Sequence, residues 1–255
     1  MQNKRVLLAM SGGVDSSACA ILLKKQGYDV IGVTLNMISE NENAIRDAKI
    51  VCEKLGIEHI VIEAKEIFKN KVINNFIETY FNIETPNPCI QCNIYLKFGV
   101  LYDYMKSNNF DYIATGHYAK IVYNEELGQK VIIKSKSEKK DQTYVLYGIE
   151  KEKLNHIIFP LGDFENKEEI RNILKDEKLD IISSKKDSQE ICFIRNNDYG
   201  KFLDKNIKTI IKKGTVVDKN GNKLGEHKGL IYYTIGQRKG LRNIKHTTII
   251  CSRIR

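Results

Sequence analysis

Long apolar runs are absent from this chain of 255 residues. No apolar stretch approaches the roughly 18 residues that a membrane-spanning helix needs. The short run that follows Lys4 and Arg5 is interrupted by Gly12 and Asp15, which makes it too short for a signal peptide. Internal repeats and long low-complexity segments are absent as well. We therefore expect a cytoplasmic globular protein without a membrane anchor, and its hydrophobic content of 42% is enough to form a core.

Two common phosphate-binding patterns are also missing. No lysine follows Gly13, as a P-loop requires, and the glycines do not form a G-x-G-x-x-G pattern. The segment that is present, RVLLAMSGGVDSS at residues 5–17, combines an apolar strand, a glycine turn and a helix start. Glycines let the backbone approach a ligand, and a helix N-terminus attracts an anion. We expect that anion to be phosphate or pyrophosphate; the simpler alternative is that Asp15 and Ser16 only cap the helix.

Strands and helices alternate through the first part of the chain. The predicted strands lie at about 5–10, 30–35, 58–63 and 111–115. The predicted helices lie at about 15–26, 43–55, 66–81 and 93–107. This order predicts a parallel sheet with helices on both faces. Ligands bind beyond the carboxyl ends of such strands, so we expect the SGGVDSS loop and the Thr115–Tyr118 segment to meet there.

The predicted secondary structure changes twice along the rest of the chain. Residues 119–135 predict a hairpin, and residues 141–205 predict mainly helix with breaks at 159–163 and 183–187. From about 207 a short β pattern with an Asn-Gly turn follows, so we place a domain boundary near 205. Residues 201–255 hold 14 basic against 3 acidic residues, whereas residues 1–200 hold 27 against 29. A basic end of this kind indicates a polyanionic partner or, equally, a lysine-rich solvated surface.

Seven sequence motifs, in this order along the chain, resemble those of two known groups of enzymes. SGGVDSS resembles the PP-loop of ATP pyrophosphatases, which split ATP between the α and β phosphates and adenylate a substrate. The other six are NPCIQCN at 87–93 followed by KFG at 97–99, ATGHYA at 114–119, KDQTY at 140–144, FPLG at 159–162, SQEICF at 188–193 and YTIGQRKG at 233–240. Together they resemble the tRNA-specific 2-thiouridylases, from residue 5 to about residue 242.

The resemblance implies an α/β fold. A parallel-sheet, adenine nucleotide α-hydrolase-like PP-loop domain with a helical tRNA-binding extension would occupy residues 1–205. A small, basic, incomplete β-rich domain would occupy residues 206–255. Relatives continue for about another hundred residues into a C-terminal β-barrel that helps to grip tRNA, and this chain leaves the pattern near Arg242. We expect ATP binding to survive this truncation and tRNA affinity to be weakened.

The family converts the wobble uridine, U34, of certain tRNAs to 2-thiouridine. The resemblance implies that ATP adenylates the C2 oxygen, and that Asp15 helps to hold Mg²⁺ with pyrophosphate. The residues that would contact ATP are Ala9, Met10, Ser11, Gly12, Gly13, Val14, Asp15, Ser16, Leu35 and Gly116. Without the resemblance, Leu35 would be interpreted as a plain core strand residue.

Six cysteines occur, of which Cys19 and Cys52 lie on apolar helix faces as packing residues. The resemblance assigns Cys192 as the residue that receives a persulfide from a sulfur carrier such as a cysteine desulfurase or relay protein. It assigns Cys92 as the nucleophile that attacks this persulfide, releases sulfide and leaves a Cys92–Cys192 disulfide. Because Cys92 precedes the helix predicted at 93, we expect the helix start to favour its thiolate.

Cys89 stands where many relatives have aspartate. It adds a third thiol, so Cys89, Cys92 and Cys192 could instead hold a [4Fe–4S] cluster with one open iron. A redox-active Cys89–Cys92 disulfide is a third alternative. The sequence leaves these routes open.

Contacts with the tRNA anticodon loop are implied on the same basis. The target base has to leave the stack to reach a pocket of this kind. The residues implied are Asn87, Pro88, Cys89, His117, Lys140, Asp141, Gln142 and Gln237. His117 has an alternative role as a structural histidine behind the ATP site. Arg238 and Lys239 would contact phosphates.

Three other functions compete with ATP-dependent tRNA thiolation. A PP-loop enzyme could adenylate a substrate that is then attacked by an amine, which would not need Cys92 and Cys192. A truncated remnant could bind ATP or tRNA without turnover. An iron–sulfur redox module would have a cluster chromophore and no requirement for ATP.

Overall fold

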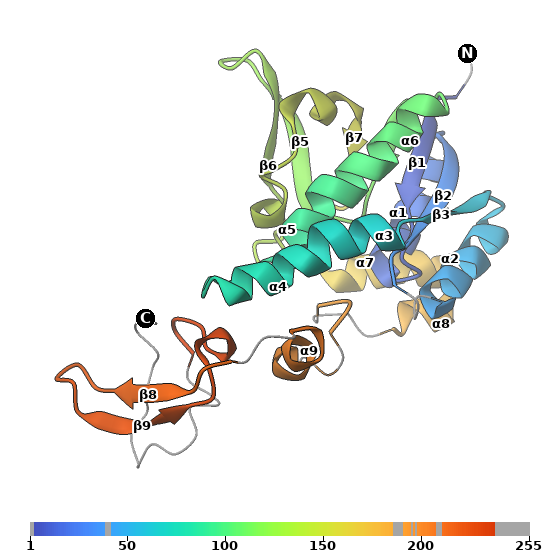
Figure 1. The fold of residues 1–255 in the computed structure, drawn as a ribbon. Coiled ribbons are helices and arrows are strands. Elements are labelled where there is room, and N and C mark those ends of the chain that lie inside the picture. Colours follow the sequence, from blue (N-terminus) through green and yellow to red (C-terminus); the bar gives the residue numbers. More distant parts are fainter. Residues whose placement is uncertain are drawn as a thin grey trace. The chain divides into compact units, whose positions relative to one another are not determined.

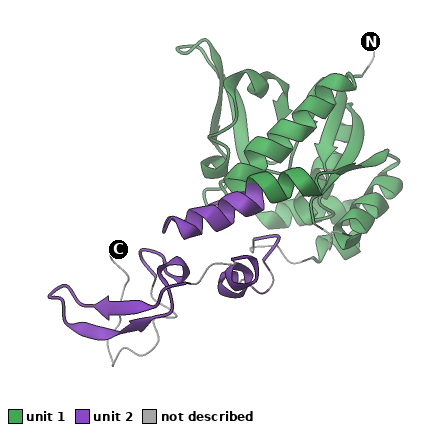
Figure 2. Cartoon of the chain, in the orientation of Figure 1, with its two compact units in different colours: residues 1–71, 89–189 green, residues 72–88, 190–255 purple. Residues whose placement is uncertain are grey.

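The computed structural model describes residues 3–38, 42–185, 191–194, 196, 198–207 and 211–237. Arg238, Lys239 and Cys251 lie outside the described residues. The chain divides into two compact units, Met1–Lys71 with Cys89–Gln189 and Val72–Pro88 with Glu190–Arg255 (Figure 2). The boundary predicted near residue 205 falls inside the second unit and stays a prediction. No helix among the described residues is long and apolar enough to cross a membrane.

A five-stranded parallel sheet forms the centre of the first unit (Figure 1). In spatial order its strands are β3 (His59–Glu63), β2 (Asp29–Asn36), β1 (Arg5–Ala9), β4 (Tyr112–Ala114) and β7 (Ile157–Ile158). The parallel sheet and four of its strands confirm the prediction. The fifth, β7, lies where helix was predicted, because two residues pairing with Ile113 and Ala114 are too few to show a strand pattern.

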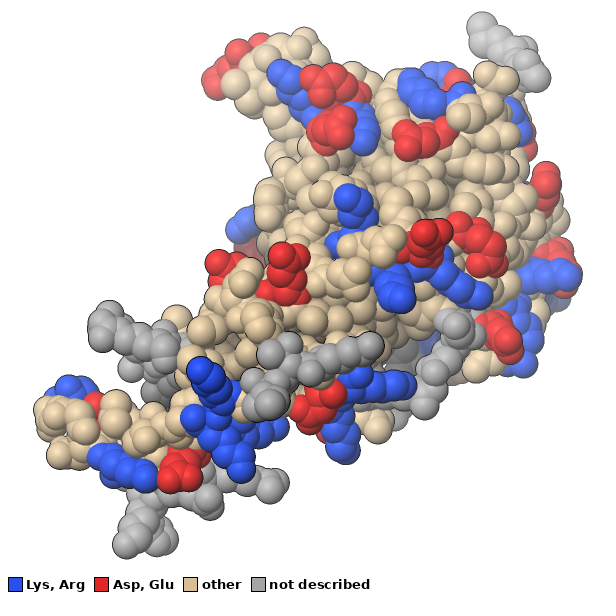
Figure 3. Space-filling model, viewed as in Figure 1, with Lys and Arg blue, Asp and Glu red and all other residues tan. Residues whose placement is uncertain are grey.

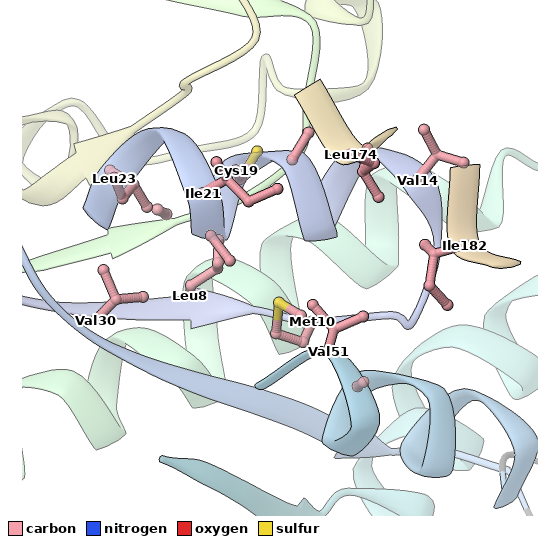
Figure 4. Close-up of a cluster of buried hydrophobic side chains, with 14 of the residues drawn as sticks. Leu8, Met10, Val14, Cys19, Ile21, Leu23, Val30, Val51, Leu174 and Ile182 are labelled. Atoms are coloured by element: carbon pink, nitrogen blue, oxygen red, sulfur yellow. The ribbon is translucent and has the colours of Figure 1, made fainter. Parts of the chain in front are cut away.

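Both faces of the sheet are covered. Val6, Leu7 and Leu8 on β1 are all fully buried, and consecutive strand residues point to opposite faces. Val6 and Leu8 belong to one apolar cluster that includes α1 (Val14–Lys25), α2 (Glu42–Leu55), α7 (Lys167–Asp176) and α8 (Asp180–Ser183) (Figure 4). Cys19 and Cys52 are buried in this cluster, which confirms that they are packing residues.

Two longer helical runs each contain a π-helical piece. The first comprises α3 (Lys65–Phe68), η1 (Lys69–Ile73) and α4 (Asn74–Phe81). The second comprises α5 (Pro88–Cys92), η2 (Asn93–Val100) and α6 (Leu101–Ser107). The helix predicted at 93 therefore begins five residues early. Proline favours the first helical position, because its fixed φ suits a helix and its missing N–H is not needed there.

The remaining elements of the first unit are short. The predicted hairpin is present as antiparallel strands β5 (Ala119–Asn124) and β6 (Gln129–Lys134). Two 3-10 turns follow, η3 (Thr143–Val145) and η4 (Lys151–His156). The expectation that residues 141–205 are mainly helical is therefore only partly right.

The second unit has a small aromatic core. It contains α4, α9 (Tyr199–Asn206), β8 (Gly214–Val217), β9 (Lys223–His227) and η6 (Leu230–Tyr232). Phe76 packs edge-on against Phe193 and Phe202, and the rings of Tyr80 and Tyr199 are stacked with centroids 5.5 Å apart. The predicted Asn-Gly turn joins β8 to β9. Figure 3 shows blue patches of Lys and Arg side chains on the described part of this unit.

Candidate functional site

The loop between β1 and α1 is held in a shape that only glycine suits. Gly12 has φ +69°, and a Cβ there would lie 2.7 Å from the carbonyl oxygen of Ala44 and 2.8 Å from Cβ of Asp47. The Ser16 hydroxyl donates to the carbonyl of Gly13 at 3.2 Å and accepts from the N–H of Ser11 at 3.2 Å. The loop is thereby fixed around the first turn of α1, whose N–H groups have no partner within the helix and attract an anion.

A cavity of about 260 Å³ opens beside this loop in the first unit. Of the residues predicted to contact ATP, those that line it are Ala9, Met10, Ser11, Asp15, Ser16, Leu35 and Gly116. Gly12, Gly13 and Val14, which were also predicted to contact ATP, lie in the loop and at the start of α1 but do not line the cavity. Of the residues predicted to contact tRNA, His117 and Gln142 line the same cavity.

The loop after β4 reaches the start of α1, as the parallel topology predicted. A Cβ at Gly116 would lie 3.1 Å from Cβ of Asp15 and 3.3 Å from the backbone nitrogen of Ser16. Gly116 therefore allows two segments about a hundred residues apart to meet at one edge of the sheet. The cavity lies beyond the carboxyl ends of β1, β2 and β4, where parallel sheets bind ligands.

Asp15 has two partners in the first unit. Its Oδ1 accepts a hydrogen bond from the Tyr118 hydroxyl at 2.9 Å, and its Oδ2 pairs with Nζ of Lys167 at 2.5 Å. A capping box at Asn166 fixes the start of α7, where Lys167 is the first residue. A metal ion at Asp15 would have to share or replace the Lys167 ammonium.

A second lysine supports the loop. Nζ of Lys185 donates to the carbonyl of Gly12 at 2.8 Å and pairs with Asp47 at 2.5 Å. The sequence placed Lys97 in the KFG motif without assigning it a role. It did not single out Lys167 and Lys185, because no local pattern marks a lysine whose partner is 152 or 173 residues away.

His117 is buried against protein side chains. Only 6% of its surface is exposed, its Nδ1 lies 2.7 Å from the Thr115 hydroxyl and its Nε2 lies 3.4 Å from Nζ of Lys97. Burial, followed by the charge of Lys97, lowers its pKa well below the usual value of 6.5. The ring is therefore neutral at physiological pH.

This burial predicts a pH dependence of stability. The unfolded chain protonates His117 near pH 6.5 and the folded chain does not, so the free energy of unfolding decreases as the pH falls below that value. This one group contributes about 1.4 kcal/mol per pH unit. Urea unfolding at pH 7.5 and 5.5 measures the loss, and His117→Gln should lose less. An equal loss in both proteins would contradict the prediction.

The thiols differ in exposure. Cys92 is buried in the first unit, whereas Cys89 in that unit and Cys192 in the second unit are exposed. The expectation that a helix start favours the Cys92 thiolate is wrong, because α5 begins at Pro88 and Cys92 is its fifth residue. Burial raises the pKa of the Cys92 thiol, and the charge of Lys97 opposes that effect.

No group of three or more His, Cys, Asp or Glu is placed to hold a metal ion among the residues that the structure describes. Cys89 and Cys92 lie three residues apart on one helical turn, and Cys192 belongs to the other unit. The three-thiol cluster stays a prediction.

The other residues predicted to contact tRNA lie in several segments. Asn87 is exposed, Pro88 is buried and Lys140 is half-buried. Burial acts to raise the pKa of Asp141, but the hydrogen bonds that its carboxylate accepts from Thr143 and Ser135 together lower it. In the second unit, Gln237 lines a cavity of about 350 Å³ together with three tyrosines and Lys228. Their contacts with tRNA stay predictions.

Comparison with known proteins gives two matching family models. The tRNA methyl transferase HUP domain matches residues 4–196, and the tRNA methyl transferase PRC-barrel domain matches residues 200–248. The chain is 48% identical over 250 residues to the tRNA-specific 2-thiouridylase MnmA of Clostridioides difficile (strain 630), covering 94% of this chain and 69% of that protein. It is 50% identical over 251 residues to the protein of that name from Clostridium acetobutylicum, covering 94% and 70%.

Similarity to solved structures is more remote. The U34-tRNA thiolase NcsA from Methanococcus maripaludis, solved with its [4Fe-4S] cluster, has a TM-score of 0.49 and 19% identity. The match covers 81% of this chain and 68% of that chain. A similarity at this level does not bear on function.

Proposed function

The chain belongs to the family of tRNA-specific 2-thiouridylases, and we propose that the cavity of its first unit binds the ATP of this reaction. The protein is a tRNA-uridine 2-sulfurtransferase that thiolates the wobble uridine, U34. The family models name methyl transfer, but relatives at 48% and 50% identity are named for thiolation. The observation that carries the proposal is the meeting of the Gly12 loop, the end of β2 and the Gly116 loop around one cavity.

ATP solves a leaving-group problem in this chemistry. Oxide cannot leave C2 of uridine readily, whereas AMP can. The C2 oxygen attacks the α-phosphorus, the bond to pyrophosphate breaks, and a sulfur nucleophile then displaces AMP from C2. We place the phosphates at the Ser11–Ser16 loop, where backbone N–H groups and the start of α1 stabilise negative charge. Leu35 and Gly116 would contact the adenosine.

Mg²⁺ would neutralise the pyrophosphate when bound. Asp15 is the one acidic side chain among the described residues that line the cavity, and carboxylate oxygen suits this ion. Its pair with Lys167 would have to open or be shared. Asp15 is therefore the ligand that we assign to Mg²⁺.

Two routes can deliver sulfur. In the first, Cys192 receives a persulfide from a donor protein, the Cys92 thiolate attacks the Cys192 sulfur, and sulfide leaves as a Cys92–Cys192 disulfide forms; an external thiol then reduces the disulfide. In the second, Cys89, Cys92 and Cys192 would hold a [4Fe–4S] cluster, which would supply sulfide when bound. Cys89 is exposed and lies one helical turn from Cys92, and this third thiol is the observation that supports the second route. An iron count and visible spectrum of anaerobically purified protein distinguish them.

The tRNA would present its anticodon loop to the cavity. The side-chain oxygen of Gln142 accepts a hydrogen bond from the backbone N–H of Tyr118 at 3.0 Å, and Gln142 lines the cavity together with His117. We propose that the flipped base enters beside these two residues. Asn87, Pro88, Cys89, Lys140 and Asp141 would contact the base and its neighbours, and Gln237 would contact the backbone. Because its substrate is a tRNA, we also propose that the protein acts in the cytoplasm.

The proposal predicts AMP release that depends on tRNA. With radiolabelled ATP, Mg²⁺, sulfide and an unmodified tRNA transcript, the full chain should release AMP and pyrophosphate in equal amounts. A transcript that carries cytidine at position 34 is the matched control and should reduce AMP release to background. AMP release that is equal with both transcripts, or ADP in place of AMP, would contradict the proposal.

A further inference from the structure

Lys97 faces the cavity of the first unit. It belongs to the KFG motif at 97–99, but the family resemblance assigned no role to this lysine. Among the described side chains that line the cavity, only Asp15 and Lys97 are of types that are ionised at neutral pH, apart from His117, which is neutral. The Asp15 carboxylate pairs with Lys167. Lys97 therefore supplies the positive charge of this lining.

The backbone around Lys97 is unusual. It lies in η2, where π-helical bonding joins each N–H to the carbonyl five residues earlier, as Leu101 bonds to Leu96 at the end of the segment. Its neighbours Leu96 and Phe98 are buried, at 0% and 1% exposure, which anchors the base of the lysine side chain. A Cβ at Gly99 would lie only 3.0 Å from the carbonyl oxygen of Ile94, so the missing side chain there accommodates the wider turn.

His117 holds the end of the Lys97 side chain. An ammonium group can only donate, so Nε2 of His117, at 3.4 Å from Nζ, is the acceptor. The ring proton then lies on Nδ1, which donates to the Thr115 hydroxyl at 2.7 Å. Phe98 and Phe159 pack around the ring with centroids 6.0 and 5.8 Å away. The neutral ring is therefore a fixed acceptor that aims the lysine.

We propose that Lys97 is the cation that binds the phosphates of ATP in this cavity, and that His117 is its positioning residue. The SGGVDSS loop lacks the lysine that follows the glycines of a P-loop, and ATP brings several negative charges. Lys97, about 84 residues from the SGGVDSS loop in the sequence, supplies the positive charge that the P-loop lysine would supply. The inference rests on the proposed function only in naming ATP as the nucleotide.

Comparing the affinity for ATP with that for uncharged adenosine distinguishes a loss of phosphate binding from a general loss of structure in the cavity. Isothermal titration of the full chain should show Lys97→Met weakening ATP binding about tenfold to a hundredfold, with adenosine affinity kept within about twofold. Lys97→Arg keeps the charge and should retain most of the preference for ATP. Lys106→Met removes an exposed lysine from the same helical run and is the matched control, with both affinities unchanged.

A double-mutant cycle tests the role of His117. His117→Ala should weaken ATP binding in the wild-type background and leave the ATP-to-adenosine ratio unchanged in the Lys97→Met background, because its effect acts through Lys97. Equal weakening of ATP and adenosine by Lys97→Met, or no weakening of either, would overturn the inference. This experiment uses no tRNA and no sulfur source, so a negative result for Lys97 would not contradict the proposed thiolation. Conversely, a failure to observe tRNA-dependent AMP release would not contradict a lower ATP affinity of Lys97→Met.

Discussion

Replacing Gly12 with alanine is expected to abolish ATP binding and to destabilise the first unit by about 2–5 kcal/mol. The residue has φ +69°, a region that costs an L-amino acid energy, and the new Cβ would lie 2.7 Å from the carbonyl oxygen of Ala44 and 2.8 Å from Cβ of Asp47. Neither neighbour can move freely, because both belong to α2 and Asp47 is held by Lys185. The loop would have to move away from α2 and lose its shape.

Gly56→Ala is the matched control. Gly56 has φ +63°, but a Cβ there meets nothing within 4 Å. It should lose only the conformational cost of about 1–2 kcal/mol and should bind ATP normally. Urea unfolding measures the two free energies, and calorimetric titration measures the two affinities. If Gly12→Ala costs no more than Gly56→Ala and still binds ATP, the loop is not the tight cradle described here.

Replacing Cys92 with serine is expected to reduce thiolation by about a thousandfold or more, because a hydroxyl cannot replace the thiolate in either sulfur route. ATP affinity should change by less than about twofold, since Cys92 is not among the residues that line the cavity. Cys192→Ser should have the same effect on thiolation. The measurement is the 2-thiouridine content of tRNA by mass spectrometry after digestion.

Cys52→Ser is the control for general damage. Cys52 is fully buried, so a serine there leaves a buried hydroxyl, as it does at Cys92. This variant should lose some stability and keep thiolation near the wild-type rate. Thiolation that survives Cys92→Ser would contradict both sulfur routes, because each of them needs the Cys92 thiol.

Local patterns predicted much of the fold. The apolar strand before SGGVDSS, the periodic residues of α2 and the Asn-Gly turn before β9 each depend on residues that are close in sequence. The meeting of the Gly12 and Gly116 loops followed from parallel topology, because the carboxyl ends of neighbouring parallel strands lie at one edge. These features can therefore be predicted from the sequence alone.

Other features depend on tertiary packing. β7 is two residues long, and η2 is a π-helix, which no hydrophobic period distinguishes from an α-helix. Lys167 and Lys185 reach the loop from 152 and 173 residues away. The pKa of Cys92 was misjudged because the helix begins at Pro88 and the thiol is buried, and burial is a property of the folded unit.

One measurement tests the central claim that this cavity uses ATP to activate U34 for attack by sulfur. The full chain, ATP, Mg²⁺, sulfide and unmodified tRNA are combined, and AMP and 2-thiouridine at position 34 are quantified in the same sample. The account predicts one thiouridine for each AMP, with neither formed when ATP is left out. Thiouridine that forms without AMP, or AMP with uridine converted to any product other than 2-thiouridine, would contradict it.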